Sequence, residues 1–308
     1  MKKTIYCPDI TCESCVKVLT RAFDNVDGVK NFQIKKDHVL VDYNDKKIQP
    51  SALLEAIREK GYRAGFTPFS RKTFRERTRD FLSNKKKYEV EYSMLRYTFL
   101  SFFFLVLLEI LGYYTFFKQN PGFLTQYGWW IFYTDVMVVS VAAAIWHFKS
   151  YRVEIPHMTG MMIGMTIGMT SGLMIGTIIA VTNGLFVGAL TGMILSSLVG
   201  WYTGKCCGVM GVLEGLMAGV MGAMMGSMIG VMLISEHILI FMPVFMILML
   251  TVLGGLSYML FEEVVEDKEA IERMPVDFWT FFSYCFLATF LLILIMLYGW
   301  KSAIVMVM

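Results

Sequence analysis

The sequence lacks the motifs that ATP-driven ion pumps need. It contains no Gly-x-x-x-x-Gly-Lys-Ser/Thr phosphate loop, and "DKTG", "TGE" and Cys-Pro-Cys are all missing. At 308 residues the chain is also too short for a P-type ATPase. No catalytic triad and no paired-carboxylate site stands out. We therefore expect neither ATP hydrolysis nor any other enzymatic activity.

Charge and cysteine are also scarce. The net charge of +3 is too small to indicate a nucleic-acid-binding protein. The first residues, "MKKTIYCPDITCESC", have no apolar core of a secretory signal. Without such a signal, the six cysteines are not expected to form a disulfide framework. They favour metal or redox chemistry instead.

What the sequence has in abundance is apolar residues. Hydrophobic residues make up 56% of the chain, and the mean hydropathy is +0.55. Several apolar runs are long enough to cross a core of ~30 Å at ~1.5 Å per residue. The runs cover 95–116, 129–148, 158–181, 184–203, 208–234, 238–261 and 278–299. The sequence therefore predicts an α-helical integral membrane protein with about seven transmembrane helices.

Basic residues orient these predicted spans. A connector over 67–93 carries eight Lys or Arg against four Asp or Glu. Lys149, Arg152 and Lys205 fall on the same side as the connector if there are seven spans. Because basic loops stay inside, we expect a multi-pass protein of the cell membrane with a cytoplasmic N-terminus. The predicted domains are 1–66, the linker 67–93 and a transmembrane domain over 94–308, with a Met/Gly-rich core at 157–234.

The first 66 residues read as a small α+β domain. "KKTIYCP" is strand-like, and an amphipathic helix beginning near "CESC" ends at Gly28. "VKNFQIKKDHVLVDYN" alternates as a hairpin does, and "PSALLEAIREKG" has the ends of a helix. "YRAGF" is expected to be a last short strand. The order βαββαβ predicts a ferredoxin-like fold.

The stretch "TCESC" places two thiols where the first strand meets the first helix. Cys12 falls in the loop and Cys15 in the first helical turn, where the helix N-terminus favours thiolates. Two soft sulfurs suit Cu(I). A thioredoxin-type redox pair would need a βαβ context. A zinc site would need four ligands, and only Cys7 and His38 are near in sequence.

With these residues the region resembles the heavy-metal-associated domain of copper chaperones and P-type metal ATPases. The resemblance covers residues 3–66, and Thr11, Cys12 and Cys15 match the motif Gly-Met-Thr-Cys-x-x-Cys. This sequence reads "DITCESC", so an isoleucine, Ile10, stands where the family has a buried methionine. The resemblance implies Cu(I) binding by the two cysteines. It also implies that Tyr62 covers the site, as in bacterial members.

Methionine and glycine are concentrated in one part of the chain. Residues 158–232 hold 14 of the 25 methionines and 17 of the 26 glycines. In "HMTGMMIGMTIGMTSGLMIG" a glycine recurs every fourth residue, which predicts close helix packing. On a helical wheel of 208–234 the methionines share one face and the glycines occupy the opposite face. The methionine face comprises Met210, Met217, Met221, Met224, Met228 and Met232, with Glu214 among them.

Packing explains the glycines, but leucine would fill the methionine positions equally well. Thioethers are soft ligands for Cu(I), so the methionines indicate a metal path; the alternative is that they are flexible filler. The short turn "GKCCG" is expected to lie near the start of the third run and to form a soft-ligand entrance with it. The expected entrance residues are His157, Met158, Met161, Met165, Met169, Cys206 and Cys207.

The sequence therefore favours a Cu(I) transport protein in membrane lipid, acting as a homo-oligomer without nucleic acid. Two alternatives remain: a membrane copper sensor or store, and a mercuric-ion transporter that uses Cys206 and Cys207. Buried carboxylates in membranes are functional candidates. Glu214, Glu109 and Asp135 are such candidates, unless they only pair with neighbours. His147 is expected to be an interfacial residue.

Overall fold

The computed structural model forms two compact units, of which each is described by itself. The structure describes residues 2–8, 10, 13–24, 26, 28–35, 37–44, 48–60, 62, 64–68, 88–118, 122–152, 157–261, 272–273 and 277–302.

The described residues of the N-terminal unit form a three-stranded antiparallel sheet and two helices. Its elements are β1 (Lys2–Tyr6), α1 (Glu13–Asp24), β2 (Val29–Lys35), β3 (His38–Tyr43) and α2 (Pro50–Arg58). The strand order is β1-β3-β2. Pro50 begins α2, where its missing N–H costs no hydrogen bond. Apolar side chains from α1, α2 and alternate positions of β3 form one core, which includes Leu19, Phe23, Val39, Val41, Leu53 and Ile57.

The predicted last strand is wrong in extent. Gly65 forms one isolated β-bridge with Tyr6. The Tyr6 N–H donates to the Gly65 oxygen at 2.8 Å, and the Gly65 N–H donates to the Tyr6 oxygen at 3.1 Å. The fourth strand is thus reduced to one bridge on the free edge of β1. The predicted ferredoxin-like arrangement is confirmed. β3 lies between β1 and β2, and the Gly65 bridge is on the other side of β1.

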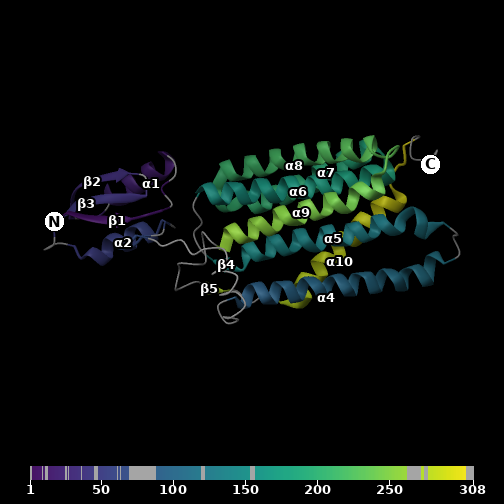
Figure 1. Ribbon diagram of the computed structural model, residues 1–308, viewed down its shortest axis with the longest axis horizontal. Coiled ribbons are helices and arrows are strands. Elements are labelled where there is room, and N and C mark those ends of the chain that lie inside the picture. The colour runs from purple at the N-terminus through teal and green to yellow at the C-terminus, as the bar shows by residue number, and fades with distance from the viewer. Residues whose placement is uncertain are drawn as a thin grey trace. The chain divides into compact units, whose positions relative to one another are not determined.

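The second unit contains the long apolar helices (Figure 1). Among the residues that the structure describes, six segments are long and apolar enough to cross a membrane, and one of them, Leu185–Met232, contains both α7 and α8. The predicted number of seven spans stays a prediction. The helices are α4 (Glu89–Gly112), α5 (Phe123–Lys149), α6 (His157–Asn183), α7 (Leu185–Gly204), α8 (Gly208–Met232), α9 (Ile238–Leu260) and α10 (Phe278–Tyr298).

The described residues of this unit also form a π-helical turn at Tyr113–Phe117 that extends α4 and a 3₁₀ turn at Lys205–Cys207. Two short strands, β4 (Tyr151–Arg152) and β5 (Glu272–Arg273), pair with each other. α4 begins inside the interval 67–93 predicted as the linker, most of which lies outside the described residues. The predicted domain boundaries therefore stay predictions.

Helices α6 and α8 run parallel and touch through their backbones. A methyl group built on Gly172 of α6 would lie 2.7 Å from the Ala223 nitrogen and 2.7 Å from the Gly219 oxygen. One built on Gly230 of α8 would lie 2.7 Å from the oxygen of Thr177. A side chain at these positions would push the helices apart, so the glycines are what permits the contact.

Helix α7 runs antiparallel to both and closes a three-helix group with them. Gly188 of α7 lies against Ala180 of α6, and Gly219 of α8 lies against the backbone of Ser196. The hydroxyl of Ser196 donates a hydrogen bond of 2.9 Å to the Gly219 oxygen across the α7–α8 contact. We call α6, α7 and α8 the glycine group; they lie together in Figure 1.

Helices α4, α5 and α10 pack through aromatic side chains. The ring centroids of Phe102 and Phe132 join α4 to α5 at 5.7 Å, and those of Phe104 and Phe282 join α4 to α10 at 6.1 Å. Trp146 and Phe281 join α5 to α10 at 5.9 Å. We call these three helices the aromatic group.

Asn183 joins the two groups at the end of α6. Its side-chain nitrogen donates a hydrogen bond of 3.1 Å to the Ile295 oxygen of α10. Its backbone oxygen accepts one of 2.9 Å from the Ser302 N–H. The next residue, Gly184, has φ of +106°, a conformation that favours glycine, and it reverses the chain into α7.

Candidate metal sites

Cys15 is the described cysteine of the Cys-x-x-Cys motif. It lies in the first turn of α1 and is 6% exposed. The N–H groups at this end of the helix stabilise a thiolate. Thr11 and Cys12 of the same motif lie outside the described residues.

Apolar side chains surround Cys15. Ile10 is 3% exposed and belongs to the same core cluster, so isoleucine fills the slot in which the family pattern has methionine. Tyr62 also belongs to this cluster. Cys7 is fully buried in it, as expected for a core thiol. The role of Tyr62 as a cover stays a prediction.

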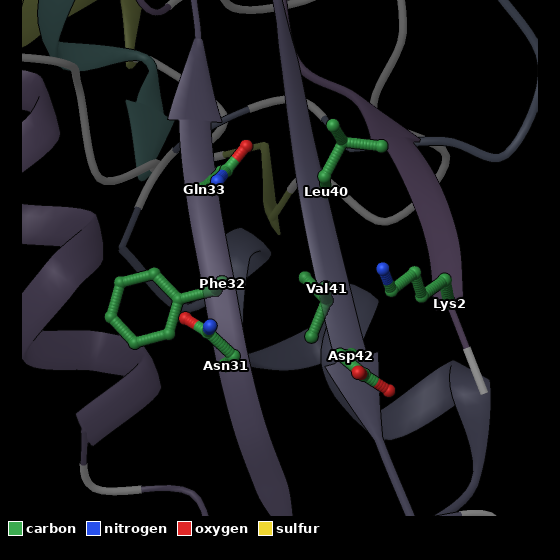
Figure 2. A pocket seen from close by; sticks show the side chains of 7 residues that line it. All are labelled: Lys2, Asn31, Phe32, Gln33, Leu40, Val41 and Asp42. Atoms are coloured by element: carbon green, nitrogen blue, oxygen red, sulfur yellow. The ribbon is translucent and has the colours of Figure 1, made fainter.

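The other face of the sheet carries a hollow that does not suit a soft metal (Figure 2). It lies over β1, β3 and β2, and its polar groups are an ammonium, two amides and a carboxylate. Its lining residues are Lys2, Asn31, Phe32, Gln33, Leu40, Val41 and Asp42. No sulfur or imidazole is among these lining residues, so this hollow offers a soft metal no ligand.

A buried thiol at the start of the first helix of a ferredoxin-like domain defines a class of soft-metal-binding domain. Here that domain is joined to a region of apolar helices, so the chain is a multi-pass membrane protein that handles metal ions. Residues 4–63 match the model of the heavy-metal-associated domain. The chain belongs to the heavy-metal-associated family through this domain.

Two relatives carry the same domain as a free protein. The copper chaperone CopZ of Staphylococcus epidermidis is 35% identical over 63 residues, which are 20% of this chain and 93% of the chaperone. The copper chaperone CopZ of Enterococcus hirae is 30% identical over 66 residues, 21% of this chain and 96% of the chaperone. No solved structure matches the chain. The two chaperones therefore match the N-terminal domain alone.

The two vicinal cysteines lie in the turn between α7 and α8, with their sulfurs 3.3 Å apart. Cys207 is buried and Cys206 is exposed. A methyl group on Gly160 would lie 2.9 Å from the Cys206 sulfur and closer still to that of Cys207. The structure therefore brings this turn to the start of α6, as predicted. The side chain of His157 lies outside the described residues, whereas Met158 is exposed nearby on α6.

The methionine face of α8 points away from the chain's own helices. All six predicted methionines of α8 are between 50% and 70% exposed, whereas the glycines of the opposite face are buried. Glu214 is partly exposed on the methionine side. A single chain thus presents these thioethers at its surface and does not enclose them.

The methionines of α6 are less uniform. Met158 and Met165 are about half exposed, and Met161 and Met169 are partly buried. A methyl group on Gly164 of α6 would lie 3.5 Å from the Gly211 oxygen, and one on Gly222 would meet the Met169 oxygen. The methionines of α6 are therefore level with α8 from its first turn to its middle.

The structure gives His147 a partner that the sequence did not show, and its predicted place at the membrane interface stays a prediction. His147 is 6% exposed, and its Nε2 lies 3.6 Å from Glu91 Oε1 of α4. Tyr151 donates a hydrogen bond of 2.5 Å to the same carboxylate oxygen. The position of His147 near the end of a run suggested the interface. Only the fold brings Glu91, which the sequence places in the linker, against it.

Within the described residues, no group of three or more His, Cys, Asp or Glu side chains could hold a metal ion. A copper site in the membrane region would therefore depend on methionine sulfur, on the cysteine pair, or on ligands from another copy. Cu(I) accepts such soft, low-coordinate surroundings.

Proposed function

We propose that the protein transports Cu(I) across the cell membrane as a homo-oligomer in lipid, without an enzymatic step. One observation carries the proposal. A chain with a heavy-metal-associated domain also bears a row of thioethers on α8 that its own helices leave uncovered. At a lipid-facing position methionine gives no more stability than leucine. A partly exposed carboxylate such as Glu214 is unfavourable against lipid. Both features favour a second copy opposite this face.

Paired methionine faces would supply a path of weak sites. Successive rungs four residues apart on α8 rise ~6 Å along the axis. At each methionine level, two or three thioethers from facing copies would bind Cu(I) weakly enough for the ion to move on to the next level. Glu214 would offset the ion's charge near the entrance. Met158, Met161, Met165 and Met169 of α6, with His157, would widen that entrance.

The cysteines would hand copper between the domain and the path. In the proposed topology the N-terminal domain and the Cys206–Cys207 turn are both cytoplasmic, since Lys149 and Lys205 lie beside this turn in sequence or in space. Cu(I) would move from Cys12 and Cys15 to Cys206 and Cys207, or back, one sulfur at a time. Each step exchanges one thiolate ligand for another, so no free ion is released.

The test is copper flux into vesicles that contain the purified full chain. The triple variant Met217→Leu, Met221→Leu and Met224→Leu keeps the shape of the face and removes three thioethers. We expect its flux to fall at least about tenfold, because losing ~1.4 kcal/mol of binding at a rung has that effect. Met249→Leu with Met259→Leu on α9 is the matched control and should keep the wild-type flux.

Unchanged flux in the triple variant would contradict the methionine path. Copper bound by the vesicles without accumulation inside them would favour the sensor or store. The third possibility, mercuric-ion transport, has its own support in the 3.3 Å approach of two sulfurs at an exposed turn. In that case Cys206→Ser with Cys207→Ser abolishes Hg(II) passage, and the methionine triple variant does not change it.

A further inference from the structure

The aromatic group encloses two carboxyl groups that the copper proposal does not use. Asp135 of α5 is fully buried, and Glu109 of α4 is partly buried with its Oε1 inside. The two side chains are neighbours, and the hydroxyl of Thr289 on α10 lies beside Asp135. They are 26 residues apart in the sequence, so only the packing of α4 against α5 brings them together.

The polar atoms of these neighbouring side chains lie close together but form no hydrogen bond of ordinary length and angle within the described residues. Both oxygens of Asp135, Oε1 of Glu109 and Oγ1 of Thr289 are buried without a partner. Buried polar groups in proteins are nearly always hydrogen-bonded, so unpartnered ones indicate a missing ligand. A pair that served only to join helices would have its oxygens satisfied by donors of the protein.

No cation of the surrounding helices compensates these carboxyl groups. The basic residues of α4, α5 and α10 are Arg96, His147 and Lys149. His147 is 12 residues beyond Asp135, or ~18 Å along the helix, and Arg96 is 13 residues before Glu109, or ~20 Å. Helix α9, which also packs on α5, has no basic residue. Cys285 of α10 is the remaining titratable group next to Asp135.

The chemistry of the pair selects its ligand. Two adjacent carboxylates in a low dielectric cannot both stay charged, and one shared proton removes this repulsion. A metal ion would need further ligands, and the described residues provide no group of three around it. We infer that Glu109 and Asp135 form a proton-binding site inside the membrane region, with the Thr289 hydroxyl as a donor to Asp135.

A hollow lies on α5 between this site and the start of the helix. It opens beside the start of α5 and extends to Trp130, and its lining includes the polar groups of Thr125, Gln126, Tyr127 and Thr182. Trp130 is five residues before Asp135, or ~7.5 Å along the axis. The hollow therefore stops more than one helical turn short of Asp135. We expect the pair to exchange its proton with water at this end of α5.

Infrared spectroscopy of the full chain in vesicles tests this inference without copper. We expect a protonated-carboxyl band at neutral pH that shifts within minutes when the vesicles are moved into deuterium oxide. The double variant Glu109→Gln with Asp135→Asn should lose the band. Asp277→Asn, which removes a carboxyl group outside the membrane helices, should keep it.

Each outcome of the infrared experiment supports or contradicts a proton-binding site at Glu109 and Asp135. A wild-type protein without the band, or a band that survives in the double variant, overturns the inference. A band that does not shift in deuterium oxide also overturns it, because the proton would then be sealed in a structural pair. The deuterium shift is measured on the wild type, so the test does not depend on the stability of the double variant. The inference stands whether or not the protein carries copper.

Discussion

The glycine group and the aromatic group solve the same packing problem in opposite ways. In the glycine group backbones touch, as at Gly172 against Ala223, and the methionines of the α8 face are turned outward. In the aromatic group rings such as Phe281 fill the space between helices, and polar side chains such as Asp135 are enclosed. The thioethers of the glycine group are therefore accessible to a neighbouring molecule. The carboxyl group of Asp135 in the aromatic group is enclosed within one chain.

Removing a ring from the aromatic group should have the largest effect on stability. Phe281 is fully buried against Trp146, so Phe281→Ala leaves a cavity and should lower the free energy of unfolding by about 4 kcal/mol. Phe290→Ala on the same helix is the control, because Phe290 is 54% exposed and should cost less than about 1 kcal/mol. Thermal unfolding in detergent measures both. Equal losses would mean that α10 does not pack by its Phe281 face.

Adding a methyl group to the glycine group should have the next largest effect. Gly172→Ala places a carbon 2.7 Å from two backbone atoms of α8 and should cost about 2 kcal/mol. Gly254→Ala on α9 meets nothing within 4 Å and should gain up to about 1 kcal/mol from helix propensity. The same unfolding measurement applies. The contrast between the groups fails if both alanines are tolerated equally.

The smallest effect is expected at the exposed methionines. The triple variant Met217→Leu, Met221→Leu and Met224→Leu should change the free energy of unfolding of the single chain by no more than about 0.5 kcal/mol. Met242→Leu, at a fully buried position on α9, should cost up to about 1.5 kcal/mol. A large loss in the triple variant would show that the methionines support the fold. Their effect on copper flux would then have no separate meaning.

Local patterns predicted much of this architecture. The four-residue glycine period predicted close contacts among α6, α7 and α8, and the short "GKCCG" turn predicted the approach of Cys207 to Gly160. The ferredoxin-like order followed from helix ends and strand alternation. These features depend on spacing along one segment or on a turn too short to reach elsewhere.

Contacts between distant segments could not be predicted. A helical wheel separates the methionine face of α8 from its glycine face. Which face is buried depends on the neighbouring helices, which a wheel of one helix does not describe. The neighbours of Glu109 and His147 are set by how α4 packs on α5, so their partners Asp135 and Glu91 were missed. "YRAGF" has a strand-like composition, yet of its described residues only Gly65 pairs with the edge of β1.

The Asn183 contacts have a mechanical consequence. Two hydrogen bonds and the packing of Gly184 on Ser302 fasten the end of α6 to α10 and to the chain beyond it. Gly160 and the Cys206–Cys207 turn lie at the opposite end of the same helix. If the glycine group tilts as one rigid lever, Asn183 is its fulcrum. The displacement then grows along α6 and is greatest at the cysteine pair.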